Sequence, residues 1–508
     1  MKSLISFTCL IFCLFIVFSQ SVAADGIKGS ISLIVGNQGQ SVNPCGQGGQ
    51  VPVCASMADA YQTYLTMTQG LNYTSSLQFE LMDGTYGSNF SPSWMKSLSI
   101  IPFSRTKGSV VFTGAYINNF VANNYTLSFT NITFSNAYGI IGATGAIDVE
   151  FDSCTFGNVN IDLTNPLLSL NGTGCSTPPQ LVLNNCLFNN LTMGADLIDV
   201  TSYTVTITNT VVSNVCGGFY FTNSSTTISG SQFTQANSYS FATLLFEGGS
   251  ATVKDSVFSE NIVSSIGIFE AINSPLPSGP FLLDHISVNE NTIQTIIPPV
   301  YIFNVQSSVV ILGSVFTNNS FENHNSAGGA IQITLAPNIA IQYCTFTNNS
   351  ALLNGGSLSI SKSTVSVSFS LIDQSSSSVG GAIYVDDNSV VNIKNTSIID
   401  NYSKNSGQNV YCKNSNISVY NSSINSYNHY GFSCQSGCSV DSDMGNICEH
   451  NSGLSKKVII GLVVGLGGSI AVLFIVLLIL RRQRNKRHYQ RINDGDHHHH
   501  HHSNTSTY

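Results

Sequence analysis

Three carboxylates alternate with apolar residues over one short segment of the chain: Asp148, Glu150 and Asp152. In a β-strand, alternate side chains lie on one face about 6.7 Å apart, which suits the two carboxylates of an inverting glycosidase. Carboxylate oxygens on one face could also bind Ca²⁺. The third interpretation is a solvated outer face, and the sequence favours it because nothing nearby tunes these groups for acid–base chemistry.

The charge balance narrows the class of partner. The formal net charge is −8, and Arg105 is the one arginine ahead of the C-terminal basic cluster. Binding to nucleic acid needs lysine and arginine to neutralise phosphates, so this acidic chain is not expected to bind it. We expect neutral sugars or proteins as partners outside the cell, and no cofactor apart from the calcium considered above.

A repeated sequence motif predicts the secondary-structure elements that position these residues. A Gly-Gly pair opens an alternating apolar run, and Phe followed by Asn comes about eighteen residues later, as in Gly328-Gly329-Ala330-Ile331 and Phe346-Thr347-Asn348-Asn349. The alternation is the period of a strand with one buried face, and a fixed spacing predicts a coil whose turns stack. The positions in phase with Phe346 are Phe134, Phe156, Phe188, Val212, Phe233, Phe258, Val288, Phe316, Ile372, Ile399 and Ile424.

The residue types agree with such a coil. Each marker Phe or Ile is expected to point inward and stack on its counterpart in the next turn. Asn fits the corner after it, because Asn tolerates left-handed backbone and its amide can pair with the next turn. Gly-Gly supplies positive φ at another corner. The prediction is an all-β, right-handed parallel β-helix.

Both ends of the coil need caps. A helical stripe that follows Ser56, including Tyr61 and Tyr64, predicts an N-terminal cap helix, and the alternation of Leu77 with Phe79 predicts a strand after it. A cysteine cluster is expected to close the other end. We place the N-terminal cap and first strands at 25–110, the repeats at 111–433, and the Cys-rich C-terminal cap with a juxtamembrane stalk at 434–455.

The Gly-Gly-Ala-Ile and Phe-x-x-Asn phrases resemble the polymorphic outer-membrane-protein repeat, and the segment from Ser56 to Tyr86 resembles the first turn of a pectin-lyase-like β-helix. The chain is similar to single-pass amoebal β-helix membrane proteins. This resemblance implies either a polysaccharide lyase or hydrolase, or a binding protein. Lyases of this fold use Arg or Lys above a calcium site. Here the repeats hold only scattered lysines, which favours binding.

The ends of the chain predict a type I membrane topology. Residues 1–24 have the build of a secretory signal peptide, and the apolar run 458–480 is long enough to cross a hydrocarbon core of about 30 Å as one transmembrane helix. The basic cluster that follows places the tail, 481–508, in the cytoplasm. We therefore expect the plasma membrane or an endolysosomal membrane, with the β-helix extracellular or lumenal.

Two motifs lie in these C-terminal segments. Gly461 and Gly465 form a small-xxx-small pair that could bring two spans together as a dimer, although glycine is also common in single spans. Tyr489 and Ile492 form a Tyr-x-x-hydrophobic motif, the kind of tail signal that clathrin adaptors bind as an extended strand. The His tract after them is assigned no role.

Secretion permits both glycans and disulfides. Eleven of the thirteen cysteines follow the signal, and an odd number leaves at least one unpaired. Cys154, Cys186 and Cys344 precede marker positions and are expected to be small buried residues. The disulfide candidates are Cys45, Cys54, Cys412, Cys434, Cys438 and Cys448. The predicted glycosylation sites are Asn72, Asn89, Asn124, Asn131, Asn171, Asn190, Asn223, Asn318, Asn348, Asn395, Asn401, Asn416 and Asn421.

Three functions are consistent with the sequence. The leading one is a membrane glycoprotein whose β-helix acts as a non-enzymatic adhesion or ligand-binding surface. The alternatives are a polysaccharide-active enzyme and a purely structural coat protein. Stacking and turning account for the repeated Phe, Asn and Gly positions, so function is expected on the outer faces or in the loops.

Overall fold

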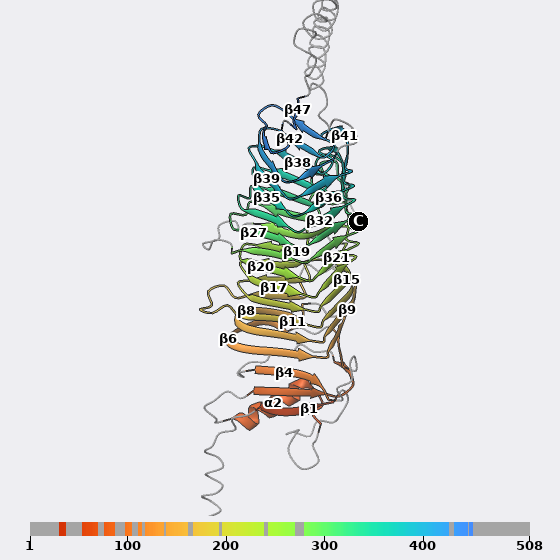
Figure 1. Ribbon diagram of the computed structural model, residues 1–508. Helices are drawn as coiled ribbons and strands as arrows, with labels where there is room; N and C mark the ends of the chain where they lie inside the picture. The colour runs from red at the N-terminus through yellow and green to blue at the C-terminus, as the bar shows by residue number, and fades with distance from the viewer. Residues whose placement is uncertain are drawn as a thin grey trace, which may run out of the picture. The chain divides into compact units, whose positions relative to one another are not determined.

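The computed structural model describes residues 30–36, 53–69, 76–86, 97–103, 110–113, 117–136, 139–160, 166–192, 196–237, 242–269, 279–425, 431–445 and 447–450. The chain divides into two compact units, Met1–Glu449 and His450–Tyr508. The strands up to Ser442 lie in the first unit, where they stack turn upon turn (Figure 1).

The predicted membrane segments lie outside the described residues. These are the signal 1–24, the span 458–480 with Gly461 and Gly465, and the tail with Tyr489 and Ile492. Within the described ranges, no helix has both the length and the apolar character that a bilayer crossing requires. The type I topology therefore stays a prediction.

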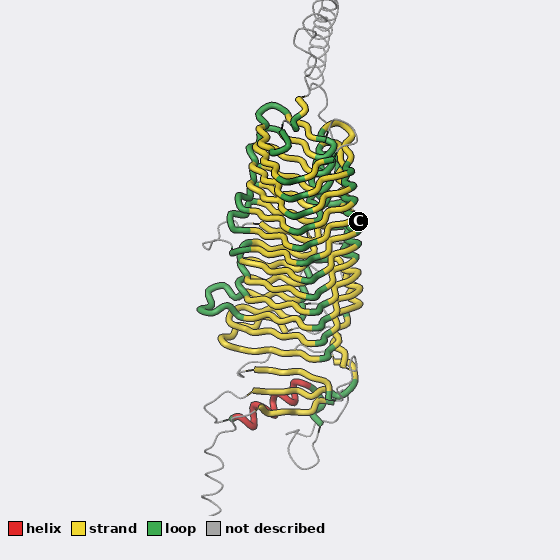
Figure 2. Tube along the Cα trace, in the orientation of Figure 1, coloured by secondary structure: helices red, strands yellow, loops and turns green. Residues whose placement is uncertain are grey.

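The predicted cap helix is present. Helix α2 (Met57–Thr68) begins after Ser56, whose Oγ accepts a hydrogen bond from the backbone N–H of Asp59 at 3.1 Å. This bond satisfies one of the amides that a helix N-terminus leaves unpaired. The helix buries Ala60 and Tyr64 and is the single red element in Figure 2.

The coil begins earlier than the sequence boundaries suggest. Strand β1 (Ser30–Val35) precedes the helix and pairs in parallel with β2 (Ser76–Leu81) after it. The segment 25–110 thus already contains turns of the coil. At the other end, β46 (Ser439–Ser442) still pairs with the preceding turn, so the Cys-rich segment continues the stack.

Each full turn of the coil contributes a strand to each of three faces, and the paired strands run parallel. Face 1 and face 2 are the two halves of a 28-stranded sheet, and face 3 is a 14-stranded sheet. A short fourth sheet holds 5 strands. This is a parallel β-helix, matching the predicted fold class.

The strands of face 1 are β10 (Leu168–Asn171), β13 (Ile198–Thr201), β16 (Phe219–Thr222), β19 (Ala242–Glu247), β22 (Ser264–Phe269), β26 (Val300–Phe303), β30 (Ile331–Thr334), β34 (Leu358–Ser361), β38 (Ile383–Asp386), β42 (Val410–Cys412), β45 (Phe432–Cys434) and β47 (Glu449–His450). The strands of face 2 are β1, β2, β4 (Ser97–Pro102), β11 (Gln180–Asn184), β14 (Thr204–Thr208), β17 (Ser225–Ser229), β20 (Ser250–Lys254), β23 (Phe281–Asp284), β27 (Val309–Leu312), β31 (Ile339–Gln342), β35 (Thr364–Ser368), β39 (Val390–Lys394), β43 (Asn416–Tyr420) and β46. Two long strands, β6 (Ile117–Thr130) and β8 (Ile141–Asp152), run through both faces.

The strands of face 3 are β3 (Gly84–Tyr86), β5 (Val110–Phe112), β7 (Thr133–Ser135), β9 (Thr155–Asn160), β12 (Leu187–Thr192), β15 (Val211–Cys216), β18 (Gln232–Thr234), β21 (Val257–Ser259), β24 (Ser287–Asn289), β28 (Val315–Thr317), β32 (Thr345–Thr347), β36 (Leu371–Asp373), β40 (Ser397–Ile399) and β44 (Ser423–Ile424). The fourth sheet consists of β25 (Thr292–Ile293), β29 (Ser320–Phe321), β33 (Ser350–Ala351), β37 (Ser376–Val379) and β41 (Tyr402–Ser406).

The marker residues form a continuous inward column on face 3. Phe316 pairs with Phe346, and their ring centroids are 4.7 Å apart with planes 6° from parallel. The column also includes Phe112, one turn before the first predicted marker Phe134, and Tyr86, two turns before it. At one late turn the prediction is wrong by one residue. Ile398, not Ile399, is fully buried and pairs with Ile372.

The corner after face 3 separates two roles that the sequence analysis gave to one Asn. Asn348 takes the left-handed conformation, with φ 53°. Asn349, the next residue, is fully buried and receives a hydrogen bond on Oδ1 from Nδ2 of Asn319 at 2.9 Å. Equivalent bonds link Asn319 to Asn291, so the amides form a ladder through the turns. Buried amides are stable here because each is hydrogen-bonded.

The two glycines of the repeated pair also differ. Gly328 has φ 77°, which favours glycine. Gly329 is needed for space, because a Cβ there would lie 2.1 Å from the carbonyl oxygen of Gly356.

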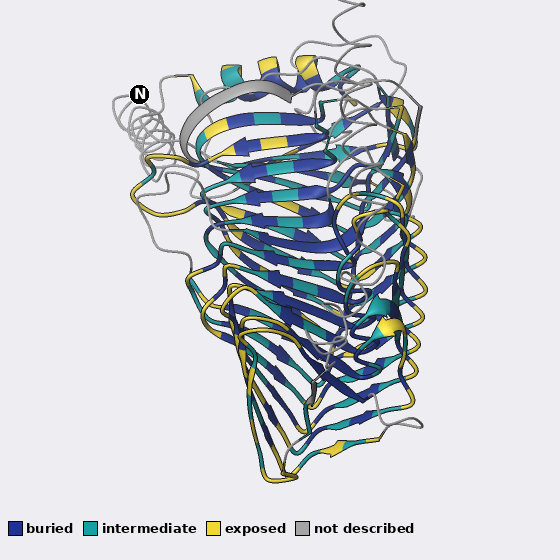
Figure 3. Ribbon diagram, turned by 90° about the horizontal axis from the view of Figure 1, so that it is seen from above, coloured by how far each residue is buried: buried dark blue, intermediate teal, exposed yellow. Residues whose placement is uncertain are grey.

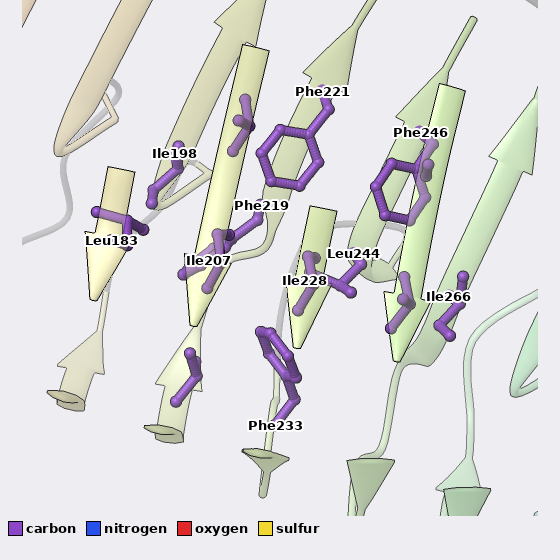
Figure 4. Close-up of a cluster of buried hydrophobic side chains, with 14 of the residues drawn as sticks. Leu183, Ile198, Ile207, Phe219, Phe221, Ile228, Phe233, Leu244, Phe246 and Ile266 are labelled. Carbon is purple, nitrogen blue, oxygen red and sulfur yellow. The ribbon is translucent and has the colours of Figure 1, made fainter. Parts of the chain in front are cut away.

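Along most strands, buried residues alternate with partly or fully exposed ones (Figure 3), whereas β42 and β45 are buried throughout. Figure 4 shows how neighbouring turns meet: Phe221 and Phe246 come from adjacent strands, and their rings stack at 5.4 Å. The alternation sends every second side chain of each strand outward, and these outward positions carry the surface chemistry.

Candidate functional site

The three predicted carboxylates lie on the outer side of β8. Ile147, Val149 and Phe151 are buried, and Asp148, Glu150 and Asp152 alternate with them toward solvent. The predicted strand geometry is therefore present.

Two of these carboxylates are engaged by the next strand. Asp148 Oδ1 accepts a hydrogen bond from the backbone N–H of Gln180 at 2.7 Å, and Asp152 Oδ1 accepts one from Nδ2 of Asn184 at 2.8 Å. In the described part of the chain, the one group of three candidate ligand atoms within 4.8 Å of one another is Cys434, Cys438 and Cys448, and all three cysteines are in disulfides. The carboxylates are thus not gathered around a point, and calcium binding stays a prediction.

Face 1 carries a different set of outward residues, which the strand register aligns in two columns. The first column, in order along the coil, is Asp199, Tyr220, Leu245, Gly267, Tyr301, Gln332, Ser359, Tyr384 and Tyr411. The second is Thr201, Thr222, Glu247, Phe269, Phe303, Thr334, Ser361 and Asp386. We call these two columns the face 1 stripe.

Tyrosines recur in the first column at a fixed interval. Tyr220, Tyr301 and Tyr384 are each three turns apart, and neighbouring turns in a parallel sheet are about 4.8 Å apart. The interval is therefore about 14 Å. All three side chains are partly exposed, so their rings are accessible from solvent.

The middle of the stripe is an aromatic cluster. Tyr301 lies 5.4 Å from Phe269 and 5.7 Å from Phe303, measured between ring centroids. Gly267 leaves the space for it, because a Cβ there would lie 2.8 Å from both Leu245 Cδ1 and Phe269 Cε2. The three rings form a partly exposed apolar platform.

Acidic groups accompany the outer tyrosines. The hydroxyl of Tyr220 donates a hydrogen bond to Glu247 Oε2, and the hydroxyl of Tyr384 donates one to Asp386 Oδ2 at 2.9 Å. Tyr384 also stacks on Tyr411, with ring centroids 5.2 Å apart and planes 5° from parallel. Each carboxylate thus holds the hydroxyl of a tyrosine in the stripe.

The surroundings raise the pKa of three of the stripe's tyrosines further above neutral. Burial raises the pKa of Tyr301 above its ordinary value. Burial, followed by the charge of Asp386, raises the pKa of both Tyr384 and Tyr411. At neutral pH these hydroxyls are therefore neutral hydrogen-bond donors.

The stripe has no cationic side chain between Asp199 and Tyr384, as its two columns show. The ion pairs of the described residues lie elsewhere, where Lys254 approaches Asp284 at 3.8 Å and Asp255 at 4.0 Å. An uncharged ligand fits this stripe better than an anionic one, because no positive charge is present to pair with an anion.

Sequence reasoning missed the stripe, although a signal for it exists. The strands Phe219-Tyr220-Phe221-Thr222, Val300-Tyr301-Ile302-Phe303 and Ile383-Tyr384-Val385-Asp386 each place Tyr between two buried apolar residues. In the sequence, such a Tyr is hard to distinguish from the buried apolar residues on either side of it. Only the strict alternation of a strand shows that its side chain points outward.

The cysteines follow the prediction in part. Cys412 bonds to Cys438, and Cys434 bonds to Cys448. Cys54 is disulfide-bonded, and Cys45 lies outside the described residues. Cys154, Cys186 and Cys344 are free and buried, as expected for small corner residues.

The predicted glycosylation sites differ in accessibility. Asn401 is 1% exposed, and its Nδ2 donates to Ile372 O and Asn409 Oδ1, so the folded structure leaves no room for a glycan there. Asn171, Asn190, Asn318, Asn348, Asn416 and Asn421 are exposed, and Asn131, Asn223 and Asn395 are partly exposed. Asn72 and Asn89, and the side chain of Asn124, lie outside the described parts.

No protein-family model and no curated protein matches the chain. Among solved structures, the chain is similar to the A-module of the mannuronan C-5 epimerase AlgE4 of Azotobacter vinelandii, with 9% identity, a TM-score of 0.30, and coverage of 72% of this chain and 86% of that one. It is also similar to tailspike protein 3 of bacteriophage CBA120, with 9% identity, a TM-score of 0.32, and coverage of 75% and 58%. Similarity at this level assigns no activity to this chain, and the resemblance to repeat families stays a prediction.

Proposed function

We propose that the protein is a type I membrane glycoprotein whose β-helix binds an extended, uncharged polysaccharide along the face 1 stripe, without turnover. The observation that carries this proposal is the recurrence of Tyr220, Tyr301 and Tyr384 every three turns on one outward column. A sugar ring has an apolar face of C–H groups that packs on an aromatic ring, and tyrosine adds a polar tip. Regularly spaced rings therefore suit a polymer with a regular repeat.

The stripe also supplies polar contacts. Sugar hydroxyls both donate and accept hydrogen bonds. The carboxylate oxygens of Glu247 and Asp386, and the hydroxyl oxygens of Tyr220 and Tyr384, can accept from them, while the hydroxyl of Tyr301 can donate. The scarcity of cations favours a neutral polymer over a polyuronate or a sulfated glycan.

Catalysis on this stripe is less well supported. Glu247 and Asp386 are five turns apart, or about 24 Å, which exceeds the roughly 5–9.5 Å between the carboxylates of a glycosidase. The lysines of the described residues do not enter the stripe, so a lyase base is missing from it as well. Binding without turnover is the function that these distances favour.

A polysaccharide array probed with the detergent-solubilised full-length protein tests the proposal. We expect selective binding to a neutral polymer, a weaker signal in Tyr301→Ala, and full signal in the control Tyr402→Ala, whose side chain is 61% exposed on the fourth sheet. Turnover of the bound polymer, or equal binding by Tyr301→Ala, would contradict it. Delivery of the chain to a membrane is tested separately, by surface biotinylation of intact cells.

A further inference from the structure

A second pair of aromatic rings lies at the corner between face 2 and face 3, away from the stripe. Tyr343 is 58% exposed and Phe369 is 49% exposed. Their ring centroids are 5.0 Å apart and their planes are 8° from parallel. This stacked pair faces solvent, so its ring surfaces are available to a partner.

The backbone makes this pair more unusual. Tyr343 has φ 55° and Phe369 has φ 52°, and bulky residues rarely adopt this left-handed conformation. At the same corner, other turns use smaller or polar residues: Asn185, Asn209, Gly230 and Gly313, which tolerate the conformation well, and Ser153, Asp255 and His285. Two consecutive aromatic residues at a position that favours Asn or Gly indicate a role for the rings themselves.

The next residue in this corner column is a glycosylation acceptor. The backbone N–H of Tyr343 donates to Ser368 O, that of Phe369 donates to Lys394 O, and that of Asn395 donates to Tyr420 O. The corner residues of successive turns are therefore Tyr343, Phe369 and Asn395. Asn395 also has positive φ, at 49°, so its side chain leaves the corner in the same way as the Phe369 ring.

Asn395 opens the sequon Asn395-Thr396-Ser397 and is partly exposed. No hydrogen bond to its side-chain amide is seen among the described residues, whereas Asn348 Nδ2 is bonded to Asn318 Oδ1 at 2.8 Å. Its amide is therefore free to carry a glycan. It lies about 4.8 Å from the Phe369 turn and about 10 Å from the Tyr343 turn.

We propose that Asn395 is N-glycosylated and that the first sugars of its glycan lie back along the corner, packed on the rings of Phe369 and Tyr343. The apolar face of each sugar covers an exposed ring, which removes apolar surface from water. Two rings on successive turns match the first two sugars of a chain that starts one turn away. The occupant of the aromatic pair is thus supplied by this protein's own modification.

Asn421 provides a matched control within the same column. It opens the sequon Asn421-Ser422-Ser423, has φ 48° at the equivalent corner, and follows Asn395 by one turn. Its neighbour on the side of the aromatic pair is Asn395 itself, so no ring occupies the adjacent position of its corner column, and the Tyr420 hydroxyl that precedes it in the chain is held by Asp441. Loss of this glycan should leave the thermal stability of the coil nearly unchanged.

The experiment uses the full-length protein made in secretory eukaryotic cells and solubilised in detergent. Glycopeptide mass spectrometry measures occupancy of Asn395, and thermal unfolding compares Asn395→Gln, Asn421→Gln, Phe369→Asn and the double variant Asn395→Gln/Phe369→Asn. Asn at 369 suits the left-handed corner and creates no sequon, because Leu371 follows Ser370. The comparison therefore removes the ring without straining the turn.

We expect occupancy of Asn395 and a fall in Tm of about 1–2 °C for Asn395→Gln. In the Phe369→Asn background, Asn395→Gln should leave the Tm unchanged. Asn421→Gln should also leave the Tm unchanged. An unoccupied Asn395, an equal effect of both glycan losses, or a loss at Asn395 that persists without the ring would each overturn the proposal. The proposal rests on the secretory topology proposed above. Polysaccharide binding to the stripe does not enter any of these readouts, so an unoccupied Asn395 in a chain that carries glycans elsewhere overturns this proposal and leaves the polysaccharide proposal standing.

Discussion

Asn319 donates a hydrogen bond from Nδ2 to Oδ1 of Asn349, one turn further along the coil, at 2.9 Å, and both side chains are fully buried. The same Nδ2 donates to Val288 O at 2.8 Å, and Asn319 Oδ1 accepts from Asn291 Nδ2 at 2.8 Å. Three neighbouring turns are therefore joined through one side chain.

Replacement of Asn319 by Ala should lower the free energy of unfolding by about 3 kcal/mol, because it removes four buried hydrogen bonds and leaves the buried backbone N–H of Asn291 without its acceptor. The control is Asn318→Gly, at the exposed left-handed corner with φ 56°, where a loss below about 1 kcal/mol is expected. Denaturant unfolding after enzymatic removal of glycans measures both. Equal losses would show that the ladder does not stabilise the coil.

The register of β40 gives a second prediction. Ile398 is fully buried, and Ile399 points outward in the same strand. Ile398→Ala should cost about 3 kcal/mol of unfolding free energy, and Ile399→Ala less than about 1 kcal/mol. The same unfolding assay measures both variants. A larger loss for Ile399→Ala than for Ile398→Ala would show that Ile399 is the buried residue, as the sequence predicted.

These two isoleucines also show how far sequence reasoning reached. The stacked Phe column and the Asn corner were predictable from the sequence. Phe and Asn recur together once per turn, and few structures other than a stacked coil explain that repeat. Ile398 and Ile399 are both apolar, so composition could not choose between them, and only the register with Ile372 does. The face 1 stripe was missed for a related reason. Tyr220 and Tyr301 are more than eighty residues apart, and the number of turns between them sets their alignment.

The stripe predicts a dependence of affinity on its rings. Tyr301→Ala should weaken binding of the neutral polymer about fivefold, which corresponds to roughly 1 kcal/mol for one lost stacking contact. Tyr301→Phe keeps the ring and should lose less. Isothermal titration with oligosaccharides of increasing length should show affinity rising when the ligand first spans the interval of about 14 Å between tyrosines. Affinity that is independent of length would argue against a shared polymer site.

Asp199, at the start of the stripe, should make stability depend on pH. Burial and then the charge of Asp196 raise its pKa in the folded protein above the ordinary 3.8. The folded state thus holds this proton more tightly, so the contribution of Asp199 to stability is greatest below pH 3.8 and falls as pH rises through the folded pKa. Asp199→Ser removes this ionisable group. The change in unfolding free energy that it causes should therefore be more favourable at pH 7 than at pH 3.5.

Serine is the chosen replacement because Asn would create the sequon Asn-Val-Thr with Val200 and Thr201. Asp196→Asn, which removes only the second cause, should change stability in the same direction by less. Unfolding curves at the two pH values measure both variants. An effect of Asp199→Ser that is the same at pH 3.5 and pH 7 would show that ionisation of this carboxyl is not involved.

The cysteines of the last turns should differ sharply from those of the middle turns. Cys434 and Cys448 are 14 residues apart and tie β45 to the segment beyond β46, so replacing both by Ser should destabilise these turns by about 3 kcal/mol. Cys344 is free, and its Sγ lies 3.2 Å from Gln342 O. Ser314 makes the equivalent hydroxyl contact to Leu312 O at 2.9 Å one turn earlier. Cys344→Ser should therefore change stability by less than about 1 kcal/mol. Hydrogen exchange resolved by residue distinguishes the two cases, because loss of the disulfide should increase exchange in β43 to β46 and leave β28 to β32 unchanged.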